Sequence, residues 1–281
     1  MIKPWVFEFL PELGSPSVEP NPADVTTLFA RYLDLWVHDE ALGFEGIFFS
    51  EHHFGRSYSP SPNLLIAALG SRTNRLRLGV MGVVVPYYHP ARVVEEIGML
   101  DHLTGGRLEI GTAIGVPQEL SRLNMSIAEA RERNDEIVTI LDAALANRVI
   151  SHQGKYFSFS NLRLLPRPLQ QPSPPRWTTV ISADSARRAA RKRIKISTGF
   201  NSTQLIKSIF DAYRQERRRL SCGARILCAA AAHNGGVDQR ASTFVRAGRN
   251  RALEELCRRR RPLEHSRSRC AGTLRRVRAQ Q

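Results

Sequence analysis

The sequence predicts an α/β fold in which βα units surround a parallel sheet. Short β-rich runs alternate with longer segments of helical period over residues 1–213. The run Gly46–Ser50 is nearly all apolar, as expected for a strand that is buried on both faces. Helix boundaries are marked as well, because Gly43 suits the end of a helix and Pro90 the first turn of another.

Six strands and six helices follow one another in order. Strands are expected over residues 5–10, 46–50, 76–85, 108–111, 177–182 and 194–198. Helices are expected from residue 24 to about 42, up to about 71, from 90, around 130–145, over 183–193 and around 206–213. Asp24 is the expected cap of the first helix. A doubly wound sheet could end after six units, whereas a closed barrel needs eight.

Two further features belong to this succession. The third helix carries apolar residues three apart, which predict a buried stripe of Val94, Ile97, Leu100 and Leu103. Residues 149–165 predict an inserted hairpin with its turn near Gly154-Lys155, followed by a Pro-rich connector to the fifth strand.

Charge divides the chain of 281 residues into two parts. Residues 214–281 hold 18 Arg and 5 acidic residues, whereas residues 1–213 hold 23 basic and 21 acidic residues. All four cysteines also lie in the final part, at Cys222, Cys228, Cys257 and Cys270. We therefore expect a barrel domain over residues 1–220 and a basic Arg-rich tail over 221–281, disordered or aberrant by composition.

Several classes of protein are set aside by composition. No run approaches the roughly 18 apolar residues of a membrane helix, so no membrane association is expected. The first residues do not resemble a signal peptide, and the body has no cysteine, so a cytoplasmic location is expected. The basic tail is an electrostatic footprint for nucleic acid, but Phe244 is its only aromatic residue, and no DNA-binding motif is present. Nucleic acid is therefore not an expected partner.

The candidate chemistry lies in Glu51-His52-His53-Phe54, directly after the second strand. Ligands meet the carboxyl ends of parallel strands, and imidazoles titrate near neutrality, which suits proton transfer. The alternative is a hydrogen-bonded histidine pair in an ordinary loop. No metal site is expected, because adjacent histidines point in different directions and neither HExxH nor paired CxxC motifs follow.

Two other strand ends could hold a phosphate. Gly111-Thr112-Ala113-Ile114-Gly115 has two glycines and a hydroxyl, and glycines let backbone N–H groups approach an anion closely. Ser182-Ala183-Asp184-Ser185 offers hydroxyls at the start of a helix. Both have a simpler reading, a glycine-containing turn in the first case and a helix cap in the second.

Taken together, these strand ends resemble the bacterial luciferase-like family of flavin-dependent monooxygenases over about residues 1–218. The resemblance rests on blocks in the same order: Gly43-Phe44-Glu45-Gly46 before Glu51-His52-His53-Phe54, Arg77-Leu78-Gly79, Val84-Val85-Pro86, His89-Pro90-Ala91-Arg92, Leu100-Asp101-His102-Leu103-Thr104-Gly105-Gly106-Arg107, Leu162-Arg163-Leu164-Leu165-Pro166-Arg167-Pro168 and Pro174-Pro175-Arg176-Trp177. It implies a TIM-like (β/α) barrel, here incomplete with about six of eight units.

The resemblance also implies an activity and a site. The family uses reduced FMN and O2 to oxidise a small organic substrate such as an aldehyde, is usually dimeric, and commonly receives reduced flavin from a separate NAD(P)H-dependent reductase. His52 matches the catalytic base, and His53 is its neighbour in the motif. The expected cofactor-binding residues are Met81 and Gly82, which match a non-proline cis peptide, Gly111, Thr112 and Gly115, and the phosphate-binding Ser182 and Ser185. Candidate residues of the substrate pocket are Tyr87, Tyr88, Thr198 and Phe200.

Three departures from the family pattern keep alternatives open. Ile114 stands where many members have a phosphate-binding arginine, so weaker FMN binding is expected. Arg193 and Lys195 replace the usual Gly and Pro. The resemblance fades near Ser221, which suggests a frame-shifted or otherwise altered ending. A deazaflavin-dependent oxidoreductase that transfers hydride is the first alternative, and a catalytically impaired remnant is the second.

Overall fold

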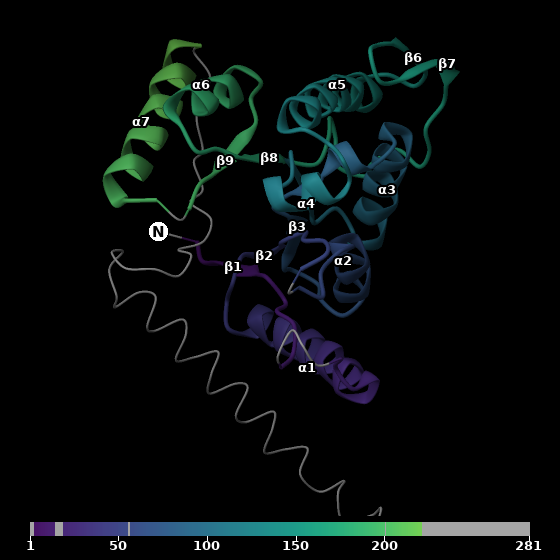
Figure 1. Ribbon diagram of the computed structural model, residues 1–281, viewed down its shortest axis with the longest axis vertical. Helices are drawn as coiled ribbons and strands as arrows, with labels where there is room; N and C mark the ends of the chain where they lie inside the picture. Colours follow the sequence, from purple (N-terminus) through teal and green to yellow (C-terminus); the bar gives the residue numbers. More distant parts are fainter. Residues whose placement is uncertain (1–2, 15–18, 56, 200, 221–281) are drawn as a thin grey trace, which may run out of the picture. The chain divides into compact units, whose positions relative to one another are not determined.

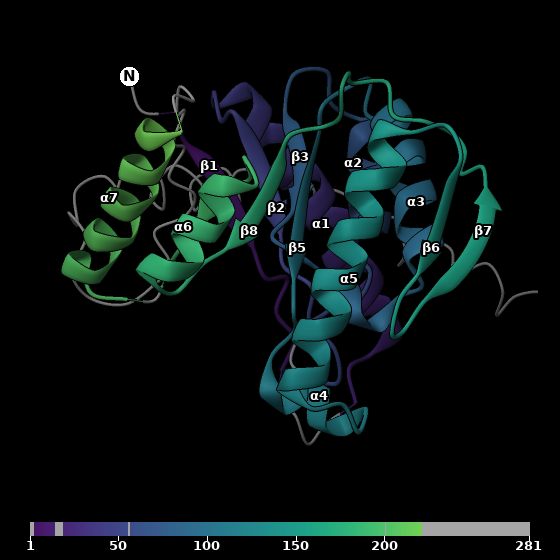
Figure 2. The same ribbon diagram turned by 90° about the horizontal axis from the view of Figure 1, so that it is seen from above.

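Parallel strands pair in chain order in the computed structural model, which describes residues 3–14, 19–55, 57–199 and 201–220. The strands of the sheet are β1 (Trp5–Glu8), β2 (Gly46–Phe49), β3 (Arg77–Val80), β4 (Val83–Val84), β5 (Leu108–Ala113), β8 (Arg176–Thr179) and β9 (Lys195–Ser197). Their order is β1-β2-β3-β5-β8-β9, with β4 also paired to β5 (Figure 2). A doubly wound sheet reverses its strand order at a switch point, whereas this order never reverses. The sheet is therefore part of a singly wound (β/α) barrel.

A helix follows each of the six strands in this order, with the short β4 lying between β3 and its helix (Figure 1). The helices are α1 (Pro22–Ala41), α2 (Pro62–Gly70), the short 3-10 helix η1 (Val85–Tyr87), α3 (Pro90–Leu103), α4 (Pro117–Arg122), α5 (Ile127–Ala146), α6 (Ala183–Arg191) and α7 (Thr203–Arg219). The six predicted βα units are confirmed. The expected tail over 221–281 lies outside the described residues.

Four local predictions need correction. The strand expected over 76–85 is split into β3 and β4 at Met81–Gly82. Helix α1 begins earlier than predicted, because Asn21 rather than Asp24 is the cap and its side chain accepts a hydrogen bond from the Ala23 N–H at 2.9 Å. Helix α4 was not predicted, since six residues are too short to show a helical period.

The fourth correction concerns the apolar stripe of α3. Val94, Ile97 and Leu100 are buried as predicted, but Leu103 is 54% exposed. Nine residues separate Val94 from Leu103, about two and a half turns at 3.6 residues per turn, so the two side chains leave opposite sides of the helix. Asp101 completes the buried face instead.

Alternating residues of the strands form two apolar layers. One set packs against the helices and includes Ile47, Phe49, Leu78 and Val80. The other set points to the concave face, where Phe48, Met81 and Trp177 pack with Trp5 and Phe7. The Trp5 and Phe48 rings stack with centroids 4.7 Å apart. Both faces of the central strands are therefore buried, which explains the nearly all-apolar sequence of β2.

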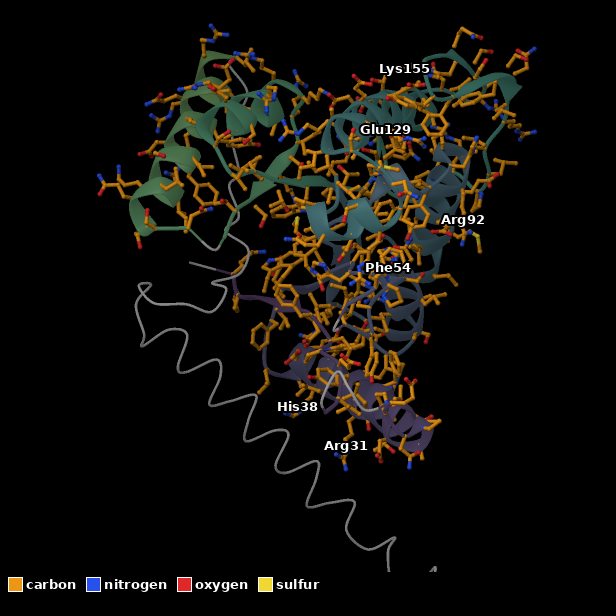
Figure 3. The ribbon with its side chains drawn as sticks, viewed as in Figure 1. Arg31, His38, Phe54, Arg92, Glu129 and Lys155 are labelled. Atoms are coloured by element: carbon orange, nitrogen blue, oxygen red, sulfur yellow. The ribbon has the colours of Figure 1, made fainter. Side chains whose placement is uncertain are left out.

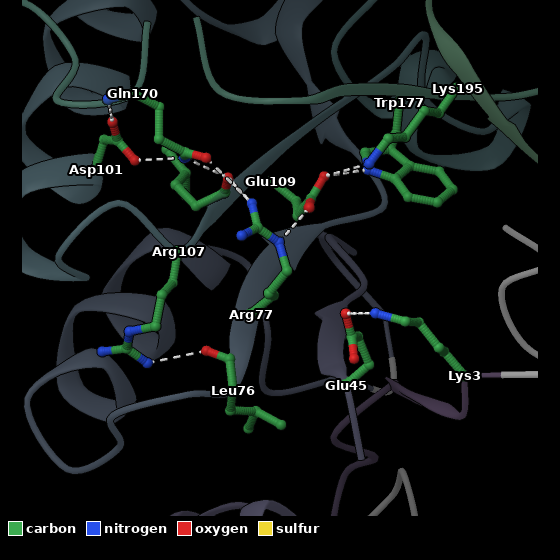
Figure 4. Close-up of polar contacts among 11 residues, drawn as sticks. Lys3, Glu45, Leu76, Arg77, Asp101, Arg107, Glu109, Gln170, Trp177 and Lys195 are labelled. Carbon is green, nitrogen blue, oxygen red and sulfur yellow. Dashed lines mark hydrogen bonds and ion pairs between the residues drawn. The ribbon is translucent and has the colours of Figure 1, made fainter. Parts of the chain in front are cut away.

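A carboxylate is buried on the concave face among these rings (Figure 4). Glu109 of β5 is 2% exposed and accepts a hydrogen bond from the Trp177 indole N–H at 2.6 Å. Arg77 of β3 forms an ion pair with its other oxygen, and Lys195 of β9 approaches at 3.4 Å. The Lys195 ammonium also lies 4.8 Å from the Trp177 ring centroid. One carboxylate thus connects four strands, β3, β5, β8 and β9.

The two departures from the family's Gly and Pro, Arg193 before β9 and Lys195 at its first position, have structural consequences. Lys195 brings a second cation to Glu109. Arg193 has a φ of 57°, in the left-handed region that glycine adopts without cost. The backbone conformation that suits a glycine is therefore retained, although the residue is arginine.

The predicted hairpin is confirmed, with β6 (Ile150–Gln153) antiparallel to β7 (Ser158–Leu162). Glu136 of α5 holds it in place. Its carboxylate accepts hydrogen bonds from the Phe157 N–H at 3.0 Å and the Tyr156 N–H at 3.1 Å, and contacts the His152 ring at 3.0 Å.

We predict that Glu109→Gln destabilises the protein by about 3–5 kcal/mol, the usual cost of breaking a buried ion pair. The amide leaves Arg77 and Lys195 on the concave face without a counter-charge. Urea unfolding followed by tryptophan fluorescence measures the change. The control is Glu132→Gln on α5, whose exposed carboxylate pairs with the exposed Lys155 and whose loss should have little effect. Equal unfolding midpoints for the two variants would contradict the assignment.

Candidate functional site

The predicted site residues follow the carboxyl ends of the parallel strands, which lie at one edge of the sheet. His52 and His53 follow β2, the Met81–Gly82 peptide follows β3 and is cis, and Gly115 follows β5. Ser182 follows β8, and Thr198 follows β9. Phe200 lies outside the described residues. The topology therefore places the described candidates along the edge at which parallel βα folds bind ligands.

His52 has a carboxylate partner from a different element. Its Nδ1 lies 3.0 Å from Glu119 Oε1, and its ring stacks on Phe9 with centroids 5.7 Å apart. Glu119 belongs to α4 and is buried, and its second oxygen has no hydrogen-bond partner among the described residues. Because a carboxylate oxygen accepts, Nδ1 donates the proton and Nε2 keeps its lone pair. The side chain of His52 is 32% exposed, whereas that of Glu119 is 10% exposed.

His53 has a second carboxylate partner. Its Nε2 lies 2.9 Å from Glu51 Oε1, and its ring meets the Tyr87 ring edge-on with centroids 5.2 Å apart. The hydrogen bond to Glu51 raises the pKa of His53, against the lowering effect of burial, and the charge of Glu119 adds to the rise. A raised folded-state pKa stabilises the fold fully below the ordinary pKa of about 6.5, and this stabilisation is lost as pH rises through the folded-state pKa.

The two tyrosines of the candidate pocket differ in their contacts. Burial, together with the charges of Glu119 and Glu51, raises the pKa of Tyr87 to about 12. The Tyr87 hydroxyl is buried and has no hydrogen-bond partner among the described residues. The Tyr88 hydroxyl instead donates to Glu51 Oε1 at 2.9 Å, and burial and that carboxylate raise its pKa. Tyr87 is therefore the tyrosine with a hydroxyl left for a ligand.

Close backbone packing accounts for the glycines of the candidate cofactor site. A Cβ on Gly111 would lie 2.0 Å from the Val80 carbonyl oxygen, and a Cβ on Gly82 would lie 2.7 Å from the Thr112 carbonyl carbon. Gly115 has a φ of 90°, in the region that favours glycine. The strands at this edge approach one another too closely for side chains at these positions, whether or not a phosphate binds there.

Ser182 and Ser185 form a capping box at the start of α6. The Ser185 N–H donates to Ser182 Oγ at 3.2 Å, and the Ser182 N–H donates to Ser185 Oγ at 3.1 Å. The simpler reading of this motif, a helix cap, is therefore present in the structure. By helix geometry the N–H groups of Ala183 and Asp184 have no partner within the helix, so they are available to an anion.

Three further side chains near the candidate site have different surroundings. Thr112 lines a cavity of about 40 Å³ between the sheet and helices α2 and α3, together with Val80, Tyr88 and Glu96. Thr198 has a buried hydroxyl without a hydrogen-bond partner among the described residues. Phe54, labelled in Figure 3, has a φ of 57° and is 52% exposed, and its ring centroid lies 5.7 Å from that of His53.

Sequence reasoning missed Glu119, the partner of His52. The available indication was Pro117, which suits the first turn of a helix and would have placed Glu119 in that turn. Tyr88 was grouped with the pocket residues, although its hydroxyl binds the motif's own carboxylate.

The described residues offer neither a metal-binding cluster nor a membrane-spanning helix. No cluster of three His, Cys, Asp or Glu side chains in the described ranges could hold a metal ion. None of the helices within these ranges is long and apolar enough to cross a membrane.

Comparison with known proteins identifies the family. The family model described as luciferase-like monooxygenase matches residues 13–280, nearly the whole chain. The chain belongs to the luciferase-like monooxygenase family. The match continues beyond residue 220, further than the motifs on which the resemblance rests.

Individual relatives agree with this assignment. The uncharacterized protein y4wF of Sinorhizobium fredii is 36% identical over 198 residues, which are 69% of this chain and 58% of that protein. The oxygenase component of the flavin-dependent trigonelline monooxygenase of Acinetobacter baylyi is 34% identical over 162 residues, 56% of this chain and 45% of that protein. The chain thus spans about half the length of the curated relatives it matches.

Solved structures confirm the fold. The monooxygenase RslO1 from Streptomyces bottropensis has a TM-score of 0.73 and 26% identity, covering 90% of this chain and 79% of its own. The oxygenating constituent of a diketocamphane monooxygenase from Pseudomonas putida, in complex with FMN, has a TM-score of 0.67 and 18% identity over 80% of this chain and 64% of its own. An F420-dependent secondary alcohol dehydrogenase has a TM-score of 0.63 and 15% identity over 79% of this chain and 66% of its own. At these last two identities the likeness establishes the fold alone.

We predict that Gly111→Ala destabilises the protein by about 1–3 kcal/mol, the typical cost of overpacking. The added methyl would overlap the Val80 carbonyl, so β3 and β5 must separate. The control is Gly55→Ala, where the nearest atom to the new Cβ is 3.6 Å away. Thermal melts of the two variants and the parent test this prediction, which fails if Gly111→Ala melts with the parent.

Proposed function

We propose that this chain is the oxygenase of a two-component flavin-dependent monooxygenase that uses reduced FMN and O2 to oxidise a small organic substrate. The observation that carries the proposal is the His52–Glu119 pair at the carboxyl edge of the sheet, beside the unpartnered Tyr87 hydroxyl. Family membership supports the reaction class, and the trigonelline relative is an oxygenase component. A separate NAD(P)H-dependent flavin reductase, a homodimer and a cytoplasmic location belong to the same proposal.

His52 acts in this proposal as the general base. Glu119 holds the imidazole with the proton on Nδ1, so Nε2 accepts a proton from the substrate or from a reacting oxygen. The buried carboxylate also stabilises the imidazolium that results. Tyr87, whose pKa of about 12 keeps its hydroxyl protonated at neutral pH, donates a hydrogen bond to a ligand in the site.

Reduced FMN, when bound, supplies the electrons with which O2 is activated. The residues that would hold it are Met81 and Gly82 beside the ring system, Gly111, Thr112 and Gly115 at the end of β5, and Ser182 and Ser185 at the phosphate. Two observations fit such a ligand: the buried hydroxyls of Tyr87 and Thr198 lack partners, and the first turn of α6 presents N–H groups. Ile114 offers no charge to the phosphate, so we expect weaker FMN binding than an arginine would allow.

A deazaflavin-dependent hydride transfer is the second candidate. It is supported by the fold likeness to the F420-dependent secondary alcohol dehydrogenase. We further propose residues 1–220 as the catalytic barrel domain and 221–281 as a separate basic segment. A catalytically impaired remnant is the outcome in which neither cofactor supports turnover.

We predict that the protein, supplied with a flavin reductase, NADH, FMN and O2, oxidises members of a panel of aldehydes and other small organic compounds. Incorporation of labelled oxygen from O2 into the product, followed by mass spectrometry, is the measurement. His52→Ala should lower the rate by about 100-fold or more, the contribution of a general base.

The matched control is His38→Ala, an exposed histidine in the last turn of α1 (Figure 3), which should retain the parent rate. Turnover with reduced deazaflavin but not with reduced FMN would favour the second candidate. Equal rates for His52→Ala and the parent would contradict the role of His52.

A further inference from the structure

We propose that Glu51 is a positioning residue that holds His53 in one tautomer, with Nε2 protonated and Nδ1 open, so that the second histidine of the motif also handles protons at the site. The inference concerns a residue to which the proposed function gives no role, and only its kinetic test rests on that function.

The carboxylate of Glu51 is fixed by three donors. Oε1 accepts from His53 Nε2 and from the Tyr88 hydroxyl, both at 2.9 Å, and Oε2 accepts from the Val84 N–H at 3.2 Å. Its side chain is 1% exposed. A buried carboxylate is costly unless its oxygens are satisfied, and both oxygens of Glu51 accept hydrogen bonds.

The three donors come from two segments of the chain, the loop after β2 and the residues that flank η1. His53 lies in the loop after β2, Val84 ends β4, and Tyr88 follows η1. Because Tyr88 and Val84 also donate to Glu51, a rotation of its carboxylate toward another His53 orientation would break these two hydrogen bonds. The ring is therefore oriented by a fixed acceptor, the arrangement by which carboxylates select a histidine tautomer.

The groups around His53 also favour an imidazole that is oriented by Glu51. Tyr87 of η1 packs edge-on against the ring, and Glu119 of α4 contributes a second negative charge while pairing with His52. Both carboxylates raise the pKa of His53, and Tyr87 stays neutral. The His53 side chain is 17% exposed, whereas that of Glu51 is 1% exposed. Each of the two consecutive histidines therefore pairs with its own carboxylate: His52 with Glu119 of α4, and His53 with Glu51 after β2.

The test is long-range proton–nitrogen NMR of the histidine side chains, which reports tautomer and titration without any cofactor. We expect His53 of the full-length chain to carry its proton on Nε2 and to titrate above the ordinary value of about 6.5. In Glu51→Gln, the pKa of His53 should fall, because the hydrogen-bonded negative charge that raises it is lost. The tautomer preference should weaken as well.

Two control variants separate positioning from general damage. Glu51 and Glu96 both line the cavity between the sheet and helices α2 and α3. Glu96→Gln removes the second of these carboxylates, which binds Asn63 and Arg92, and should leave the His53 titration unchanged. Tyr88→Phe removes one donor and keeps the Glu51 charge, so the pKa of His53 should remain raised. If Glu51→Gln does not fold, the parent protein and Tyr88→Phe still give both readouts.

A parent His53 protonated on Nδ1, or an unchanged titration in folded Glu51→Gln, would overturn the proposal. In the kinetic test, Glu51→Gln should move the acidic limb of the pH–rate profile to lower pH. The same substitution made in a His53→Ala background should produce no such shift. An NMR result as expected from a protein without turnover would leave the positioning role standing and remove the proposed monooxygenase function.

Discussion

The curl of the sheet depends on one buried carboxylate, Glu109. It lies among aromatic rings on the concave face and accepts from Trp177, while the cations of Arg77 and Lys195 approach it from strands on either side. These contacts connect β3, β5, β8 and β9, which are neighbours in the sheet, although Arg77 and Lys195 are 118 positions apart along the chain. Because a buried ion pair requires good geometry to offset desolvation, the strands are held at one spacing and one curvature.

The site at the other end of the strands follows from that rigidity. Fixed strand spacing explains why Gly82 and Gly111 have no room for a Cβ. It also places the end of β2 against α4 and η1, so that His52 and His53 each meet a carboxylate, Glu119 and Glu51. The histidines are exposed enough to react, whereas their carboxylate partners are buried. Such an arrangement orients proton acceptors before any ligand arrives, which is how preorganised sites lower a barrier.

Much of the architecture could be predicted from the sequence. Alternating β-rich and helical runs located all six units, and the family motif located the cis peptide at Met81–Gly82. The rest depended on contacts distant in the sequence. Leu103 has the spacing of a buried residue but lies half a turn off the stripe, and Glu119 sits in a helix too short to show a period. Lys195 was noted only as a departure from the family, because its partner Glu109 lies 86 residues earlier.

The measurement that tests the central claim most directly is an anaerobic thermal melt of the full chain with and without excess reduced FMN. Trp5, Trp36 and Trp177 all lie in the barrel and report its unfolding. A ligand that binds only the folded state, at 100 times its dissociation constant, adds about 2.7 kcal/mol. We predict a cooperative transition whose midpoint rises by several degrees with reduced FMN. A cooperative transition that reduced FMN does not move would contradict a flavin site at the carboxyl edge of the sheet.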